Sequence, residues 1–155
     1  MSRTVESADR IERAVLIERA VLIDAPIAAV WDLVSQPGWW IGDGNPANRT
    51  IVQEGDLFLV DYPPHGRFPV RPEASEAPQH VSYRGAFPGQ PIEEGTSTLV
   101  EFFLTEQGGG TLLRVVESGF ASLAIPAQDR ESAVEDNING WEQQLGFAKR
   151  DVEHG

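Results

Sequence analysis

The last quarter of the chain carries one apolar stripe, and this stripe constrains the fold more than any other feature. Its members recur at alternating steps of four and three residues: Val134, Ile138, Trp141, Leu145, Ala148 and Val152. This spacing places them on one face of a helix. Ser132 and Glu135 fit a capping box, which predicts that the helix begins near residue 130. Because strand-like sequence precedes the helix, the simplest burial for the stripe is against one face of a sheet.

Length and composition predict one domain without disulfides or zinc-thiolate sites. The chain has 155 residues and no cysteine, so disulfides and zinc-thiolate sites are excluded. We expect a flexible N-terminus over residues 1–10, a single domain over 11–150 and a flexible tail over 151–155. The first residues lack the apolar core of a secretory signal, and no run is long enough to span a membrane. A cytoplasmic location is therefore expected.

The charge balance argues against two classes of partner. Asp and Glu number 24 against 12 Lys and Arg, which gives a formal net charge of -12. Such a chain repels phosphate backbones and anionic lipid headgroups. We therefore expect no nucleic acid and no membrane surface as partners, and the acidity is otherwise explained by solubility.

A six-residue duplication opens the ordered part of the chain. Residues 11–16 and 17–22 both read Ile-Glu-Arg-Ala-Val-Leu. An even-numbered repeat preserves strand facing, so the first copy fits either a strand or a helical turn. The second copy is predicted to be a strand because it runs into Pro26, which suits the first turn of a helix. The buried side of that short helix is expected to hold Ile27, Val30, Trp31 and Val34, and residues 39–42 form a second helical or turn segment.

Period-two sequence then predicts six further strands. A hairpin around Gly55 joins the first two, and Pro69 and Pro72 confine the next strand to a sheet edge or a bulge. The expected strand ranges are 49–53, 57–62, 67–74, 79–86, 97–105 and 111–118. Gly108, Gly109 and Gly110 join two strands and open no helix, so they predict a hairpin loop and not a phosphate cradle.

Four short motifs in this order resemble the START-like, helix-grip (SRPBCC) superfamily. They are Ile23-Asp24-Ala25-Pro26 with Val30-Trp31, Gly55-Asp56-Leu57-Phe58, Glu117-Ser118-Gly119-Phe120, and Asn139-Gly140-Trp141 with Leu145. The chain is most similar to the branch named after the activator of a heat-shock-protein ATPase. The resemblance implies an α+β fold in which a curved seven-stranded antiparallel sheet wraps a long C-terminal helix, with two short helices after the first strand. It also implies a mostly apolar cavity between sheet and helix. Gly85 departs from the pattern, because many relatives carry a bulky aromatic residue there, and the change would enlarge the cavity or open its mouth.

Strand alternation and the helix stripe then predict the residues that line such a cavity. Phe58, Val60 and Tyr62 share one face of their strand, and Leu113, Val115 and Glu117 share one face of the last strand. The candidate ligand-binding residues are Trp40, Phe58, Tyr62, Tyr83, Phe102, Leu104, Val115, Glu117, Trp141 and Leu145. The alternative is that all of them form an ordinary filled core, since patterning specifies an inside without saying whether it is hollow.

Two polar or amphipathic features carry more specific expectations. A buried Glu117 carboxylate should reach the cavity mouth, meet an arginine such as Arg71, or have a raised pKa, and the alternative is a solvated strand end. Trp39 and Trp40 cannot both face inward on a short segment. One of them is expected in the core and the other at the rim of the cavity or over a loop.

No catalytic or metal-binding constellation is predicted. His65, His80 and His154 are far apart in sequence, which argues against a metal site, and no cofactor is expected. His65 or His80 with Asp61 or Glu117 could form an acid–base pair, although surface histidines are the favoured interpretation.

Three functions therefore compete. The favoured one is a binding module for a small apolar or aromatic molecule. The second is a polyketide-cyclase-like or hydrolytic enzyme that uses the same cavity. The third is a co-chaperone, although the resemblance implies that the eukaryotic activator grips its chaperone with an additional N-terminal domain. The ligand and the oligomeric state are left open.

Overall fold

The computed structural model describes residues 16–155, and within them one sheet and one long helix dominate. The chain begins with β1 (Ile17–Ile23) and α2 (Ile27–Val34) and ends with α3 (Ala127–His154). Between them lie β2 (Thr50–Glu54), β3 (Leu57–Tyr62), β4 (Gly66–Glu76), β5 (His80–Ala86), β6 (Ser97–Gln107) and β7 (Gly110–Ser118). Two single 3-10 turns, η1 (Pro46–Asn48) and η2 (Phe120–Ser122), complete the list. Of the duplicated segment, the second copy forms β1 as predicted, whereas residues 11–15 of the first lie outside the described residues.

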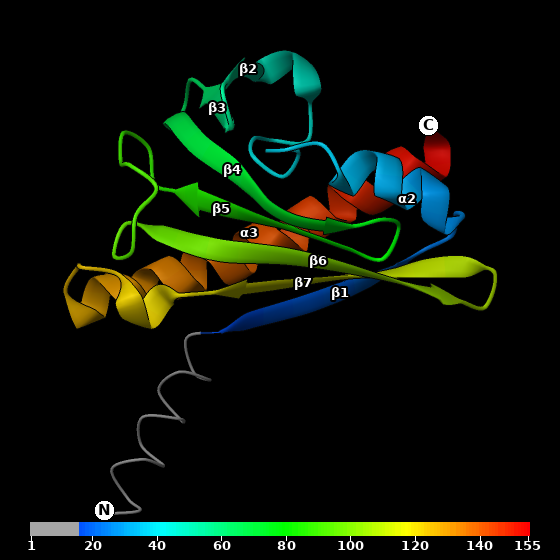
Figure 1. Ribbon diagram of the computed structural model, residues 1–155. Helices are drawn as coiled ribbons and strands as arrows, with labels where there is room; N and C mark the ends of the chain where they lie inside the picture. Colours follow the sequence, from blue (N-terminus) through cyan, green and yellow to red (C-terminus); the bar gives the residue numbers. More distant parts are fainter. Residues whose placement is uncertain (1–15) are drawn as a thin grey trace, which may run out of the picture.

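The strands form a seven-stranded antiparallel sheet in the order β1-β7-β6-β5-β4-β3-β2. Figure 1 shows the sheet curving over α3, with α2 near the C-terminal end of that helix. The helix-grip α+β architecture is thus confirmed. Residues predicted to share the inner face are direct partners across β6 and β7: Val100 opposes Glu117, and Phe102 opposes Val115.

The two prolines of β4 are accommodated inside the sheet. β4 lies between β3 and β5, so its predicted position at a sheet edge is wrong. The alternative of a bulge is confirmed, because the pairing register shifts between Pro72 and Ala74. The bulge absorbs one residue where proline has no N–H to donate to the ladder.

The long helix starts earlier than the capping box predicted. α3 begins at Ala127, and Pro126 occupies the N-cap with extended backbone and no side-chain cap. Proline fits at the start of a helix because its ring fixes φ near the helical value. In addition, the backbone N–H that proline lacks would have no hydrogen-bond partner there. Ser132 therefore falls inside the helix, and its predicted cap role is wrong. At the other end, α3 continues through His154 into the residues expected as a tail.

The helix stripe and α2 close the core over part of the sheet. Trp141, Leu145 and Ala148 of α3 are buried, as are Val30 and Val34 of α2. The segment 39–42 is a turn, and the second short helical element is η1. Among the described residues, no helix combines the length and the apolar character that a membrane crossing needs.

Candidate functional site

A cavity of about 420 Å³ lies between the inner face of the sheet and the part of α3 that precedes its buried stripe. The turn after α2 contributes Trp40, the end of β3 contributes Tyr62, and β4 contributes Phe68 and Val70. The other walls come from β5, β6, β7 and α3, with Gly85, Thr98, Val100, Glu117, Asn137, Gly140, Trp141 and Gln144 among their residues. Strands and a helix from distant parts of the chain therefore form its walls.

Two glycines help to create this space. Gly140 of α3 lines the cavity, and a Cβ added there would meet no atom within 4 Å. Gly85 of β5 lines the opposite wall, where the nearest atom to an added Cβ is the Pro69 carbonyl oxygen at 3.9 Å. Both positions thus lack the side chains that would otherwise project between helix and sheet.

The adjacent tryptophans divide between core and cavity. Trp39 is 4% exposed and packs on Phe102 with ring centroids 5.2 Å apart. Trp40 is half-buried and lines the cavity, with its ring centroid 6.1 Å from that of Trp141 and 5.1 Å from that of Tyr83. Trp40 also packs on Phe102, with ring centroids 5.4 Å apart. Both indoles therefore face inward, so the prediction that only one could do so is wrong, although Trp40 alone of the two lines the cavity. Contact of Trp40 with a ligand stays a prediction.

Glu117 is the polar centre of the cavity wall. Glu117 lies near the end of β7 and is only 5% exposed. The Thr98 hydroxyl of β6 donates to Oε2 at 2.6 Å. Two side chains one turn apart on α3 donate to Oε1, the Asn137 amide at 3.0 Å and the Trp141 indole N–H at 2.8 Å. The carboxylate therefore links β6 and β7 to α3 at the cavity wall.

The environment of Glu117 pulls its pKa in two directions. Burial raises the pKa of this carboxyl above its ordinary value, because a low-dielectric surrounding disfavours the charged form. The hydrogen bonds from Thr98, Trp141 and Asn137 favour the carboxylate and act against that rise. Burial is the larger effect, so the alternative of a solvated strand end is wrong and the predicted raised pKa holds.

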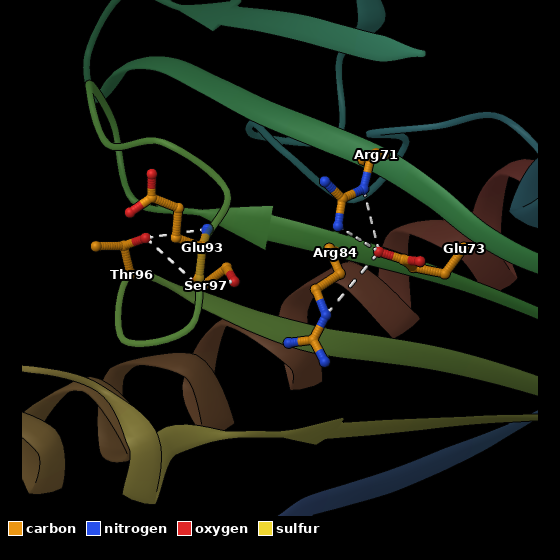
Figure 2. A network of polar contacts seen from close by, with 6 residues as sticks. All are labelled: Arg71, Glu73, Arg84, Glu93, Thr96 and Ser97. Atoms are coloured by element: carbon orange, nitrogen blue, oxygen red, sulfur yellow. Dashed lines mark hydrogen bonds and ion pairs between the residues drawn. The ribbon is translucent and has the colours of Figure 1, made fainter.

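The predicted partnership of Glu117 with Arg71 is also wrong. Figure 2 shows Arg71 and Arg84 converging on Glu73, with Arg71 Nη2 2.8 Å and Arg84 Nε 4.0 Å from Glu73 Oε1. Arg71 and Arg84 line a second hollow of about 360 Å³, whose wall also includes Glu93 and Ser97. The Ser97 hydroxyl donates to the Glu93 carbonyl oxygen at 2.6 Å. The charges of Arg71, Glu73 and Arg84 are about one third exposed, so solvent screens them. Arg71 is therefore occupied away from Glu117.

Tyr62 and His65 contribute polar groups to the cavity wall. Both line it, and their ring centroids are 5.3 Å apart. Burial and the nearby Asp43 carboxylate raise the pKa of the Tyr62 hydroxyl, so this group is a neutral hydrogen-bonding group at physiological pH. The wall can therefore offer a hydroxyl and an imidazole to a bound molecule.

The acid–base pair of His80 with Glu117 is not formed. His80 Nε2 lies 3.0 Å from Glu101 Oε2, and its ring stacks on Phe103 at 4.7 Å. Glu101 opposes Val116 in the sheet and thus faces away from Glu117. Asp61 is engaged by Arg67 through two hydrogen bonds of 3.1 and 2.9 Å. Over the range 16–155, no group of three or more His, Cys, Asp or Glu side chains could hold a metal ion.

The structure separates the ten predicted ligand-binding residues into two groups. Trp40, Tyr62, Glu117 and Trp141 line the cavity. The others lie outside its wall: Phe58 is half-buried at the margin of the core, and Tyr83, Phe102, Leu104, Val115 and Leu145 are buried in it. The Tyr83 hydroxyl, which needed a partner, donates to the Val34 carbonyl oxygen at 2.6 Å.

Sequence reasoning missed several cavity residues. Phe68 alternates with Val70 on β4, and this pattern could have indicated it. Asn137 lies four residues before Trp141, so helix spacing could have placed both on one face. Thr98 precedes Val100 and Phe102 on the same face of β6, and only its polarity kept it out of the prediction.

Comparison with known proteins gives a family and a fold. The family model described as Activator of Hsp90 ATPase homolog 1-like protein matches residues 24–148. No curated protein matches. Many solved structures do, at low sequence identity, and three of them are described next.

DynU16, a protein of the dynemicin biosynthetic locus, is 22% identical with a TM-score of 0.65 over 90% of this chain, which spans only 48% of DynU16. CalU16 from Micromonospora echinospora is 19% identical with a TM-score of 0.55, covering 90% of this chain and 75% of its own. CV1439 from Chromobacterium violaceum is 17% identical with a TM-score of 0.65, covering 90% and 98%. Likeness at this identity establishes the fold alone.

Proposed function

Since the chain belongs to the family of Activator of Hsp90 ATPase homolog 1-like proteins, we propose that it binds a small, largely apolar or aromatic molecule between its sheet and α3. The observation that carries this proposal is the cavity of about 420 Å³ with aromatic walls and one buried carboxylate. Its size falls in the usual range of small-molecule sites, roughly 300 to 1,000 Å³.

The wall composition suits such a molecule. Trp40, Phe68 and Trp141 present large apolar surfaces, and burying apolar ligand area against them yields about 25 cal/mol per Å². Glu117 and the Tyr62 hydroxyl supply the few polar contacts that fix orientation. A ligand with an apolar body and one polar end is the chemical class that this wall fits.

The first test identifies the occupant directly. Native mass spectrometry of freshly purified protein should detect a bound molecule as a discrete mass above that of the chain. Denaturation should release it. A protein that carries no molecule and binds no member of an apolar and aromatic compound library would contradict the proposal.

A cavity-filling variant tests the location. Gly140→Leu should fill the space beside α3 and lower affinity for the recovered molecule by at least about tenfold, because its side chain takes the ligand's place. Gly146→Leu is the matched control, since Gly146 is an exposed glycine of the same helix with open space around it. Equal affinities for the two variants would place the ligand elsewhere.

Tryptophan fluorescence gives an independent readout. A molecule in the cavity should quench Trp40 and Trp141, which line it, more than Trp39, which is buried in the core. Trp40→Phe should therefore reduce the quenching. The same quenching in Trp40→Phe and in the wild type would remove Trp40 from the site.

An enzymatic use of the cavity is the second candidate function. It is favoured by the raised pKa of Glu117, since a buried carboxyl with a raised pKa can act as general acid or base. His65 lines the same cavity. If the recovered molecule is converted on incubation with the protein and Glu117→Gln stops the conversion, the site is catalytic; an unchanged mass leaves binding as the function.

A co-chaperone role is the third candidate and rests on the family description alone. Capture of a heat-shock-protein ATPase by the purified chain, and stimulation of its ATP hydrolysis, would support it. Absence of both at micromolar concentrations would argue against it.

A further inference from the structure

The charged groups around the cavity are of one sign. Glu117 and Asp136 contribute carboxylates to its wall, and none of the lining residues is a lysine or an arginine. His65 is the one residue of the wall that could become positive. With a formal net charge of -12 over the whole chain, the cavity lies in a field that attracts cations and repels anions.

Among residues 16–155, the buried Glu117 carboxylate has no cationic partner. Its three donors are a hydroxyl, an amide and an indole, all neutral groups. A buried carboxylate is costly unless it is both hydrogen-bonded and paired with a positive charge. The fold thus supplies the hydrogen bonds but not the opposite charge.

The donor geometry leaves room for that charge. The Asn137 Nδ2 amino group and the Trp141 indole N–H both donate to Oε1. Oε2 receives only the Thr98 hydroxyl, so one of about four acceptor positions on the carboxylate is unused. An N–H of a ligand that enters the cavity can occupy it.

Aromatic faces around the same space favour a cation as well. Trp40 and Trp141 line the cavity with ring centroids 6.1 Å apart, and Tyr62 lines it as well. A cation within about 6 Å of an indole or phenol ring is attracted by the negative face of the π-system. A neutral apolar ligand would gain burial from these walls but would leave the carboxylate without its counter-charge.

We propose, on the basis of the function proposed above, that the natural ligand is a cationic amine with an apolar or aromatic body. Its ammonium group pairs with Glu117 while the body lies between Trp40, Phe68 and Trp141. The inference combines the buried carboxylate, the sign of the wall charges and the aromatic lining.

Three matched probes test this inference: 1-naphthylmethylamine, 1-naphthylmethanol and 1-naphthoate. They share one aromatic body and differ in the charge of the polar end. Isothermal titration calorimetry of the wild-type protein at neutral pH should show the amine binding at least about tenfold more tightly than the alcohol, and the carboxylate more weakly than both.

Glu117→Gln should abolish the preference for the amine. The variant keeps the shape, and its amide oxygen can accept from Asn137 and Trp141 while its NH₂ group donates to the Thr98 hydroxyl. Its amine-to-alcohol ratio should fall to about one, with the alcohol affinity changed by less than about twofold. Glu106→Gln, an exposed residue of β6, removes the same charge far from the cavity wall and should keep the preference.

The outcomes separate this inference from the proposed function. Alcohol binding that equals or exceeds amine binding in the wild type overturns the amine and leaves a neutral-ligand receptor. An amine preference that survives in Glu117→Gln overturns the role of Glu117. Failure of all three probes to bind overturns the amine inference, and the proposed function is then decided by native mass spectrometry and the compound library. Should Glu117→Gln fail to fold, the wild-type series decides alone.

Discussion

The inner face of β6 is filled at one end and hollow at the other. Phe102 and Leu104 are nearly inaccessible, and Phe102 packs on Trp39 and Trp141 with ring centroids 5.2 and 5.7 Å away. Thr98 and Val100, on the same face of the same strand, line the cavity. The alternation along the strand is identical at both ends.

The difference comes from what covers each end. The filled end is covered by Trp39 of the turn after α2 and by Trp141 of α3, both of which pack on Phe102. The hollow end faces Asn137 and Gly140 of α3, which line the cavity without filling it. Strand pattern thus decides which side chains point inward, whereas the bulk of the covering residues decides whether a cavity is left beside them.

The largest loss of stability is expected on truncation of Trp141, which packs on Phe102 at the filled end of the inner face and also lines the cavity. Trp141→Ala should lower the free energy of unfolding by about 3 to 5 kcal/mol, because it removes a large core side chain. It also deprives the buried Glu117 of a donor. Trp141→Phe, which keeps an aromatic ring, should cost less. Denaturant titrations measure both, and a Trp141→Ala variant as stable as the wild type would mean that the residue does not hold the ends together.

The two ends should then respond differently to the same truncation. Phe102→Ala should cost about 3 to 5 kcal/mol, whereas Phe68→Ala, from a half-buried residue of the cavity wall, should cost about 1 to 2 kcal/mol. Chemical denaturation under identical conditions compares them. Equal losses would show that the cavity wall is packed as tightly as the core.

A smaller effect should appear as a pH dependence. The raised pKa of Glu117 means that the folded protein keeps a proton that the unfolded chain has lost. Wild-type stability should therefore decline as the pH rises above the ordinary value of 4.5 and through the pKa of the folded state. Glu117→Gln should lack this contribution. As the pH rises, the free energy of unfolding of the variant should therefore increase relative to that of the wild type, as denaturant titrations at several pH values measure. A shift in the opposite direction would mean that the three donors outweigh burial.

The smallest effect concerns the helix itself. Gly140→Leu and Gly146→Leu should each raise the free energy of unfolding by about 0.5 to 1 kcal/mol, since glycine is a poor helix former and both positions have open space. Thermal unfolding of the two variants measures the gain. A loss at Gly140 alone would indicate that the hollow end cannot accept a side chain.

Much of the architecture was predictable because it follows from the spacing of apolar residues within single segments. The stripe of α3, the hairpin at Gly55 and the inward faces of β6 and β7 all follow from spacing along one segment. The start of α3 was mispredicted because Ser132 has the chemistry of a cap, whereas Pro126 fixes the boundary through its backbone. For β4 the prolines left an edge and a bulge open, and only the pairing with both neighbouring strands decides for the bulge.

The candidate site was predictable only in part, for a different reason. Glu117 and Trp141 could be named from their phase on a strand and a helix. That their side chains meet, at 2.8 Å, depends on how α3 crosses the sheet. Equally, Phe102 and Val100 look alike in the sequence and both are buried, but only Val100 also lines the cavity, which depends on the residues that pack over the sheet.

If the cavity binds a ligand as proposed, the lifetime of the protein depends on the supply of that ligand. A molecule that binds only the folded chain adds about 2.7 kcal/mol at a concentration one hundred times its Kd. The unfolded fraction, on which proteases act, shrinks accordingly. The amount of folded protein would then fall when the ligand is scarce and rise when it is abundant, without any dedicated regulator.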